Sequence, residues 1–344
     1  MKKFSILFAL LVTVTGSFAQ TGPGKRSTFH FSFAPPLSTS GRYAAEYTNT
    51  VSLSMLAGLS ENEEAFSLAG LANIVMNDAN GFQLSGLLNY AGNSGRGFML
   101  SGLANVVHNN YRGFQLTGLG NIASSMEGFQ LAGLGNIAGD MKGFQLAGLG
   151  NIAGDVRGFQ LSGLFNYAKN VSGVQFAGLF NIAETSDCPI ALLNIIKNGE
   201  YSVAATYNEA GSAVLTFRSG GLVTYGILGV GYNHKSNDKG FVTEGGLGAH
   251  INIAHWLRVN NEIKAGSIGD FSDSSTFYAN YALLPAFRIL HNLELFGGPS
   301  VNYMQSDDTG NKNMFPNHSI WKKHSDTKLQ QVYVGWQAGV QFLF

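Results

Sequence analysis

Hydrophobic and glycine positions recur at a fixed interval of 15 or 16 residues through the middle of the chain. Residues 128 to 155 show this most clearly, because GFQLAGLGNIAGD stands there twice. Self-similarity at a fixed short period is typical of a repeat architecture. Alignment on Gly-Leu-x-Asn gives one asparagine per copy: Asn73, Asn89, Asn105, Asn121, Asn136, Asn151, Asn166 and Asn181. A companion glutamine recurs at Gln83, Gln115, Gln130, Gln145, Gln160 and Gln175, with Ser67 and Met99 in the two other copies.

Each copy is too short for a pair of helices, and its frequent glycines disrupt helical periodicity. The copy instead predicts three short extended segments, FQLAG, LGNIA and GDMKG, which are separated by tight corners and form one coil. Successive coils would lie about 4.8 Å apart, so identical residues would stand directly above each other. We therefore expect an apolar stack of Leu, Phe and Ile, glycines at corners with positive φ, and a structural ladder of inward or corner asparagines.

The same repeats could alternatively form strands that run up and down through a membrane. Successive copies would then point in opposite directions and identical residues would not stack, and FQLAGLGN lacks the period of two that such strands need. The pattern therefore favours a β-solenoid. The extra residue of the early copies falls after the asparagine, within 76–80 and 92–96, and is expected to bulge from one corner.

From about residue 200 the pattern changes to a period of two. Within 241–253 one parity is mostly apolar, whereas the other contains Glu244, His250 and Asn252. The connections between the candidate strands of this region are alternately very short and longer and polar. The exception is 209–211, which is short where a long connection is expected. This alternation and an even strand number are typical of outer-membrane barrels. The candidate strands span 201–208, 212–218, 222–232, 241–253, 257–266, 276–289, 293–303 and 331–344.

The predicted fold class is therefore all-β, with a solenoid of 15- and 16-residue repeats followed by an eight-stranded antiparallel transmembrane β-barrel. The end of the chain, QVYVGWQAGVQFLF, resembles the C-terminal insertion signal of Gram-negative outer-membrane β-barrels, with Trp336, Phe342 and Phe344 on one face. This resemblance implies outer-membrane lipid and the barrel-insertion machinery as partners.

The repeats resemble an uncharacterised bacterial family of surface repeat proteins. The resemblance includes the GFQLAGLGN copies, PIALLNIIKNG at 189–199 and FSFAPPLSTSG at 31–41. It implies a surface repeat domain and no particular activity.

The N-terminus has the features of a secretory signal peptide. Two lysines precede an apolar run over 4–14, and small residues stand at Ser17 and Ala19. The expected division is a signal peptide over 1–19, an N-terminal segment over 20–50, a solenoid over 51–199 and a barrel over 200–344.

One amphipathic strand is predicted within the N-terminal segment, because Phe29, Phe31 and Phe33 alternate with polar residues. This strand could cap the first coil of the solenoid or add to the barrel. The sequence leaves both placements open.

Composition and charge exclude some classes of partner. Lys and Arg together number 21, the same as Asp and Glu, and charged residues make up only 12% of the chain. A balanced charge without basic clusters argues against nucleic acid as a partner. The low charged fraction indicates that much of the surface does not face bulk water. The only cysteine, Cys188, excludes an internal disulfide and is expected to be buried.

An eight-stranded barrel encloses only enough space for side chains. His250 lies on the polar parity and is a weak candidate for a general base. The other histidines lack metal-ligand spacing, so no metal site or cofactor is expected. Charged residues of the polar parity are expected to form an interior network: Glu244, Arg258, Glu262, Lys264, Arg288 and Glu294.

These features predict a non-enzymatic outer-membrane protein in which the barrel anchors a repeat domain with a structural, adhesive or envelope-binding role. An even strand number and a periplasmic C-terminus would place the solenoid on the periplasmic side, in contrast to the surface location that the family resemblance implies. One alternative is a lipid-modifying or hydrolytic barrel enzyme with His250 as base. A second is a soluble exported protein in which 200–344 form a β-sandwich.

Overall fold

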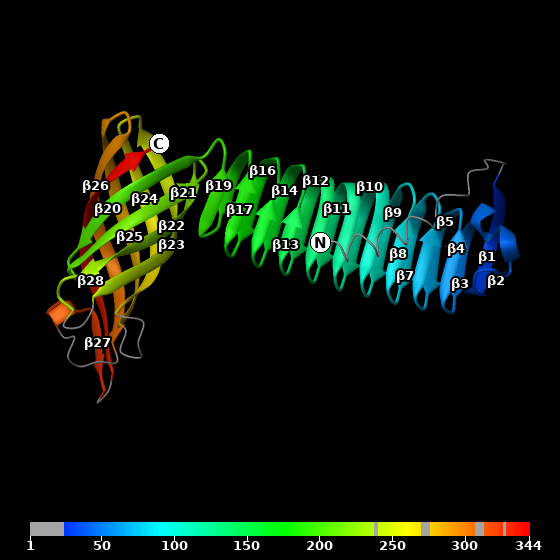
Figure 1. The fold of residues 1–344 in the computed structure, drawn as a ribbon, viewed down its shortest axis with the longest axis horizontal. Coiled ribbons are helices and arrows are strands. Elements are labelled where there is room, and N and C mark those ends of the chain that lie inside the picture. The colour runs from blue at the N-terminus through cyan, green and yellow to red at the C-terminus, as the bar shows by residue number, and fades with distance from the viewer. Residues whose placement is uncertain (1–23, 237–239, 270–275, 307–312, 326–327) are drawn as a thin grey trace.

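The computed structural model describes residues 24–236, 240–269, 276–306, 313–325 and 328–344. The predicted signal peptide lies outside these residues. The described chain forms one 19-stranded sheet that is coiled into a solenoid and one 9-stranded sheet that closes into a barrel. Figure 1 shows the coils stacked in a row, with the last one against the wall of the barrel. The predicted fold class is confirmed.

The solenoid contains nineteen strands and one short 3₁₀ helix. Its elements are β1 (Lys25–Ala34), β2 (Leu37–Ser38), η1 (Gly41–Glu46), β3 (Tyr47–Ser54), β4 (Ala57–Ser60), β5 (Asn62–Ala69), β6 (Ala72–Val75), β7 (Ala79–Ser85), β8 (Leu88–Ala91), β9 (Gly95–Ser101), β10 (Ala104–Thr117), β11 (Gly120–Ala132), β12 (Gly135–Ala147), β13 (Gly150–Ile152), β14 (Asp155–Ser162), β15 (Phe165–Tyr167), β16 (Asn170–Ala177), β17 (Phe180–Ala183), β18 (Thr185–Ile190) and β19 (Leu193–Ile196).

Identical residues stand above each other along the solenoid, because neighbouring coils pair in parallel and local bulges absorb the differences in length between copies. β11 pairs with β12 so that Asn121 lies opposite Asn136 and Gln130 opposite Gln145. The longer early copies keep this register, because their surplus residue is taken up at a corner between Val107 and Asn110. One repeat therefore makes one coil, and the spacing between paired strands sets the rise from coil to coil.

The N-terminal amphipathic strand belongs to the solenoid and lies apart from the barrel. β1 pairs in parallel with β3 over Lys25 to Ser32, so the solenoid begins well before residue 51. His30 and Ser32 point inward and are buried, whereas Phe29, Phe31 and Phe33, which alternate with them, are exposed. The strand thus provides the first coil.

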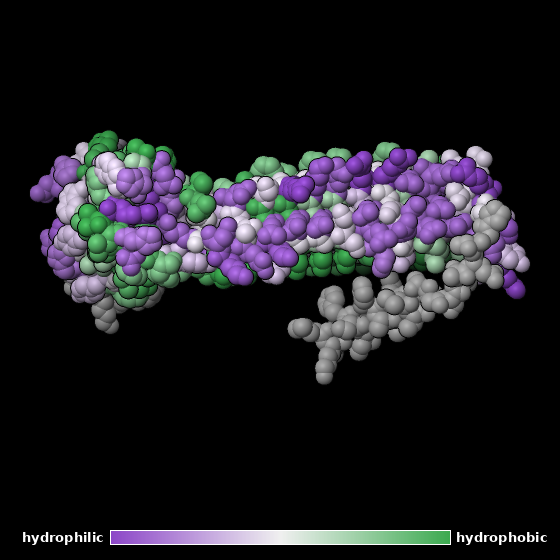
Figure 2. Space-filling view, turned by 90° about the horizontal axis from the view of Figure 1, so that it is seen from above, coloured by the Kyte–Doolittle hydropathy of each residue, from purple (hydrophilic) through white to green (hydrophobic). Residues whose placement is uncertain are grey.

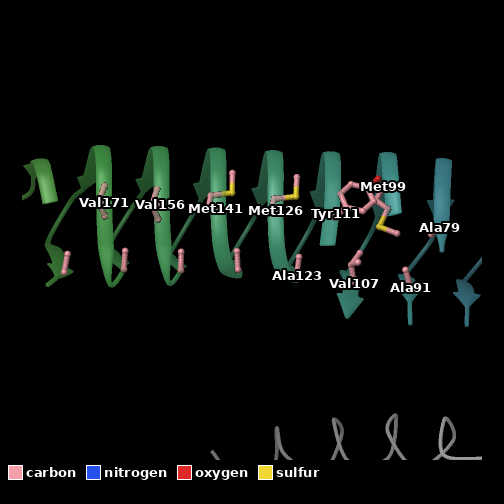
Figure 3. Close-up of a cluster of buried hydrophobic side chains, with 14 of the residues drawn as sticks. Ala79, Ala91, Met99, Val107, Tyr111, Ala123, Met126, Met141, Val156 and Val171 are labelled. Atoms are coloured by element: carbon pink, nitrogen blue, oxygen red, sulfur yellow. The ribbon is translucent and has the colours of Figure 1, made fainter. Parts of the chain in front are cut away.

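The predicted apolar stack exists, but it lies on the outside of the coil. Phe129, Leu131, Leu134 and Ile137 of one coil are each 43 to 47% exposed. The interior holds the asparagine and glutamine rows, alanines, and a row that continues from Tyr111 through methionines to valines. Figure 3 shows this last row above a row of small side chains. The phenylalanines, leucines and isoleucines of the repeat lie outside, because the amide rows, the alanines and the row that begins at Tyr111 already fill the narrow interior.

The narrow coil depends on glycine at two corners of each copy. Gly128 has a φ of 131°, and its equivalents in the neighbouring copies also have positive φ. A Cβ at Gly128 would collide with the backbone oxygen of Gly113, and one at Gly133 would collide with that of Gly118. Any other residue there would force the coils apart.

The barrel consists of eight long strands and one short addition. They are β20 (Glu200–Asn208), β21 (Ser212–Gly220), β22 (Thr224–Asn233), β23 (Phe241–Ala254), β24 (Leu257–Ile268), β25 (Thr276–Leu290), β26 (Leu293–Ser306), β27 (Trp321–His324) and β28 (Leu329–Leu343).

Pairing of β20 with β28 closes the barrel, so the alternative of a β-sandwich is wrong. All other neighbours pair antiparallel in chain order. The short connection 209–211 follows from the short β20 and β21. Where β20 has ended, β27 pairs with the free edge of β28, with Trp321 opposite Val332. The barrel thus has a short-turn end and a long-loop end.

The last coil of the solenoid packs on the outer wall of the barrel at the short-turn end. The backbone amide of Asn194 donates to Ser219 Oγ at 3.0 Å, and Thr224 Oγ1 donates to the carbonyl of Pro189 at 2.7 Å. Gly226 lies directly under the carbonyls of Ala191 and Leu192, where no side chain would fit. Cys188 lies beside this junction and is half-buried rather than buried.

The asparagine ladder predicts a large cost for removing one rung. Asn136 Nδ2 donates to Asn151 Oδ1 at 2.9 Å and to the carbonyl of Leu146 at 2.8 Å, and its Oδ1 accepts from Asn121. Asn136→Ala removes these three hydrogen bonds, and each buried group that this leaves unsatisfied costs about 1 to 3 kcal/mol. We expect amides of residues 116–162 to exchange hydrogen at least about 100-fold faster in the folded full-length chain, as measured by mass spectrometry.

Lys142→Ala is the matched control, because Lys142 lies in the same coil and is exposed. Its exchange pattern should equal that of the wild type. Wild-type protection in Asn136→Ala would show that the ladder does not hold the coils together.

A buried carboxyl lies in the interior near the N-terminal end of the solenoid, on β5. Glu63 is 2% exposed and accepts hydrogen bonds from Ser52 Oγ at 2.7 Å and Asn49 Nδ2 at 3.2 Å. Burial raises the pKa of Glu63 to about 7, and the hydrogen bonds from Ser52, Ser60 and Asn49 oppose this shift. The folded state therefore binds a proton more tightly than the unfolded chain.

This raised pKa predicts that the solenoid loses stability as the pH rises from about 4.5 to 7. The contribution of the protonated carboxyl to stability is fully present below the unfolded pKa. This contribution of about 3 kcal/mol is lost as the pH rises from the unfolded pKa through the folded pKa. Thermal unfolding followed by circular dichroism at pH 5 and pH 8 should show a smaller loss for Glu63→Gln. Equal losses in the two proteins would contradict the assignment.

Candidate functional site: the wall and interior of the barrel

The outer wall of the barrel is apolar on every long strand. Outward positions alternate with buried ones, as in β25, where Phe277, Tyr281, Leu283 and Phe287 are 40 to 46% exposed. The predicted insertion-signal residues lie on this wall, because Trp336, Phe342 and Phe344 are 47 to 66% exposed. A wall of this kind can contact the acyl chains of lipid.

Aromatic side chains gather on the wall at both ends of the barrel. At the short-turn end Trp256 stacks on Phe287 and Tyr201 on Phe344, with ring centroids 6.2 and 6.3 Å apart. At the long-loop end the pairs are Tyr207 with Trp336 and Phe277 with Tyr303. Aromatic girdles at these two levels are typical of membrane barrels.

The two girdles have the separation that a bilayer requires. Phe277 and Phe287 belong to opposite girdles and stand ten residues apart on β25. Ten residues span about 34 Å along a strand and about 26 Å along the axis of a barrel whose strands tilt by 40°. This height matches the roughly 25 Å apolar band of outer-membrane barrels.

The predicted interior charges lie inside the barrel and pair with each other. Glu262 is fully buried between Arg218, at 2.8 Å, and Lys264, at 3.5 Å. Lys264 also lies 3.5 Å from Glu244 and donates to Gln337 Oε1 at 2.8 Å. Each buried charge of this group therefore has an opposite charge beside it, which offsets its loss of hydration.

A second group of charges lies closer to the short-turn end. Arg258 contacts Glu294 at 2.8 Å and Glu200 at 2.7 Å. Arg288 also contacts Glu294, at 2.9 Å, and is 36% exposed at the mouth. These residues line a cavity of about 430 Å³ that opens at the short-turn end.

Arg218, Glu200 and Tyr225 also take part in these contacts, although they were not among the predicted interior residues. Arg218 lies on the inward-facing side of β21. Val214 and Thr216 lie on the same side, and this alternation in the sequence indicates that Arg218 points inward. It stood at the predicted end of the strand, where an inward position is hard to distinguish from a loop. Tyr225 donates to Glu262 Oε1 at 3.0 Å, a contact across strands that no sequence pattern indicates.

The long-loop end of the interior is filled by apolar side chains. Met314 and Phe315, from the long connection before β28, are buried against Tyr333, Met304 and residues of other strands. Within the described residues, side chains therefore fill the interior of the barrel both at its middle, where the ion pairs lie, and at the long-loop end.

His250, the candidate general base, is nearly buried in the interior. Its Nδ1 lies 2.9 Å from Asn260 Oδ1, and its ring stacks on Tyr225 with centroids 4.3 Å apart. Its Nε2 lies 3.5 Å from Glu200. Among the described residues, no three His, Cys, Asp or Glu side chains are grouped as metal ligands.

Comparisons with known proteins return only structural neighbours. No protein-family model and no curated protein matches the chain. The N-terminal barrel domain of Pseudomonas aeruginosa OprF is 15% identical, with 42% of this chain and 96% of that chain covered and a TM-score of 0.25. A designed transmembrane β-barrel is 17% identical, with 42% and 93% covered and a TM-score of 0.24. Within the described ranges no helix is long and apolar enough to cross a membrane.

The interior ion pairs predict that removing one charge destabilises the barrel. Glu262→Gln leaves Arg218 without its partner in a fully buried site, at a cost of about 3 to 5 kcal/mol. All three tryptophans, Trp256, Trp321 and Trp336, lie in the barrel, so tryptophan fluorescence reports its unfolding alone. Guanidinium unfolding of the detergent-solubilised chain should shift to lower denaturant.

The double variant Arg218→Met/Glu262→Gln provides the control, because it removes both charges. It should unfold at higher denaturant than Glu262→Gln. A double variant that is less stable than the single one would show that the pair does not act through charge compensation.

Proposed function

We propose that the barrel spans the outer membrane and anchors the solenoid, which has a non-enzymatic structural or envelope-binding role. The observation that carries this proposal is the apolar wall with aromatic girdles about 26 Å apart. Such a wall would be costly to expose to water, whereas in lipid it is stable. The interior ion pairs and the buried Met314 and Phe315 favour an anchor over a wide pore.

The lengths of the connections between the strands support an assignment of which end of the barrel faces the periplasm. Outer-membrane barrels have short periplasmic turns and longer outer loops. On this basis the short-turn end is periplasmic, and so is the solenoid, whose last coil lies at that end. We propose that the long connection that contains Met314 lies outside the cell.

A catalytic role receives less support. The ring of His250 is stacked and hydrogen-bonded inside the barrel, away from the wall that would meet a lipid substrate. A lipid-modifying activity that is lost in His250→Ala would contradict this part of the proposal.

Cysteine labelling on intact Gram-negative cells tests both the anchoring and the sidedness. In a Cys188→Ser background, single cysteines replace Ser319 in the long connection, His291 in a short turn and Lys142 on the solenoid, all of which are exposed. A membrane-impermeant maleimide should label Ser319→Cys on intact cells. It should label His291→Cys and Lys142→Cys only after the outer membrane is opened.

Two results would overturn the proposal in different ways. Label on Lys142→Cys in intact cells would place the solenoid outside. Recovery of the folded chain in the soluble fraction after a carbonate wash, with all three positions equally labelled, would exclude membrane anchoring.

A further inference from the structure

The solenoid presents large apolar side chains on two of its three faces. We name the faces by one coil: the phenylalanine face is 129–132, the isoleucine face is 135–138, and the charged face is 140–142. Leu134 stands at the corner between the first two. The phenylalanine rings form a continuous row, from Phe82 to Phe159, with neighbouring centroids 4.8 to 6.4 Å apart.

The leucine row at the corner is equally regular. Each of the eight copies that carry the asparagines from Asn73 to Asn181 exposes 40 to 46% of one leucine: Leu71, Leu87, Leu103, Leu119, Leu134, Leu149, Leu164 and Leu179. Eight coils at about 4.8 Å, on two faces about 15 Å wide, give an apolar surface on the order of 1,000 Å². The largest patches on soluble monomers cover a few hundred Å². This surface therefore requires a covering.

The third face is polar along its whole length. Its outward row consists of Asn80, Arg96, Arg112, Glu127, Lys142, Arg157 and Ser172. Arg112 contacts Glu127 at 2.6 Å, and Lys142 contacts the same carboxylate at 3.1 Å. These neighbours hold the pKa of Glu127 below its usual value. The solenoid is thus amphipathic across its long axis.

The junction places this amphipathic rod beside the lipid-facing wall. Ser219 and Gly226 face outward on β21 and β22, close to the short turn, and the last coil covers both. The next outward residues on these strands, Phe217 and Leu228, belong to the apolar wall. The apolar rows of the solenoid therefore continue directly into the wall of the barrel.

The orientation of the rod fits a bilayer. Figure 1 shows the solenoid extending sideways from the barrel, across the direction in which the barrel runs. Figure 2 views it from the short-turn end and shows a hydrophilic band along the solenoid between two hydrophobic edges. The charged face thus points away from the membrane, and the apolar faces point to the sides and toward its centre.

We propose that the solenoid lies in the plane of the membrane, with its phenylalanine and isoleucine faces in the acyl chains of the periplasmic leaflet and its charged face in water. This inference rests on the proposed membrane anchoring of the barrel. A coil about 15 Å across fits the thickness of one leaflet, which is about half of a 25 to 30 Å hydrocarbon core. The rod spreads about 50 Å from the barrel within that leaflet.

Lipid fits these faces better than a second copy of the chain. The two apolar faces meet at the leucine corner and point in different directions, so one flat partner solenoid would cover only one of them. A fluid leaflet covers both faces and the corner together. Lipid also covers the wall of the barrel, with which the two faces are continuous.

Site-specific fluorescence in single-chain nanodiscs of phosphatidylcholine tests the inference. Three variants are made in a Cys188→Ser background, each with a single cysteine in place of Leu134, Lys142 or Val301. Each of these cysteines carries an environment-sensitive fluorescent probe. Val301 is 48% exposed on the wall of the barrel and marks the lipid position. The Leu134 probe should emit to the blue of the Lys142 probe, and acyl-chain doxyl lipid should quench it as strongly as the Val301 probe. Aqueous iodide should quench only the Lys142 probe.

The barrel probe separates failure of the inference from failure of the proposed function. Lipid quenching at Val301 with iodide quenching at Leu134 would remove the solenoid from the leaflet and leave the anchor intact. Absence of lipid quenching at Val301 would reject both. A Leu134 probe that is shielded from both quenchers only when two chains share a disc would assign the apolar faces to a second copy and overturn the inference.

Discussion

The hydrogen-bonded ladder of asparagine side chains is the interaction on which the architecture depends. Eight successive bonds join Asn73 to Asn194, each between Nδ2 of one coil and Oδ1 of the next, at 2.8 to 3.1 Å. A buried amide without a partner would cost about 1 to 3 kcal/mol. Because every coil from Asn73 to Asn194 carries the same residue in the same place, each amide satisfies the next. The interior can then be polar.

A polar interior determines what the exterior has to be. The glutamine row bonds in the opposite direction, since Gln130 Nε2 donates back to Gln115 Oε1 and Gln145 donates back to Gln130. The two rows of amide dipoles therefore oppose each other, which limits their summed field. With amides and small residues inside, the phenylalanines and leucines can only lie outside. The barrel also caps the ladder, because the carbonyl of Ser219 accepts from Asn194 Nδ2 at 3.1 Å.

The sequence predicted the fold well where a pattern states directly which way a residue points. Alternation with a period of two gave β23 as 241–253 against the observed Phe241–Ala254. The direction of the solenoid residues was harder, because a coil with three corners has no single parity, and bulky apolar residues are inside in most folds. The clue was the repeated Asn and Gln, whose amides gain most when stacked in a dry interior. Contacts across strands, such as Arg218 with Glu262, depend on barrel closure and register, which follow only from the folded chain.

The barrel and the solenoid together explain why only 12% of the residues of the chain are charged. Buried ion pairs hold Arg218, Glu262 and Lys264 inside the barrel, whereas the outer wall of the barrel is apolar. In a water-soluble solenoid the outward positions would carry charges on all faces, but here only the face of Arg112 and Lys142 does. A barrel alone would explain apolar residues after 200, but not the exposed rows before it. A common apolar solvent for both parts accounts for the composition of the whole chain with a single constraint.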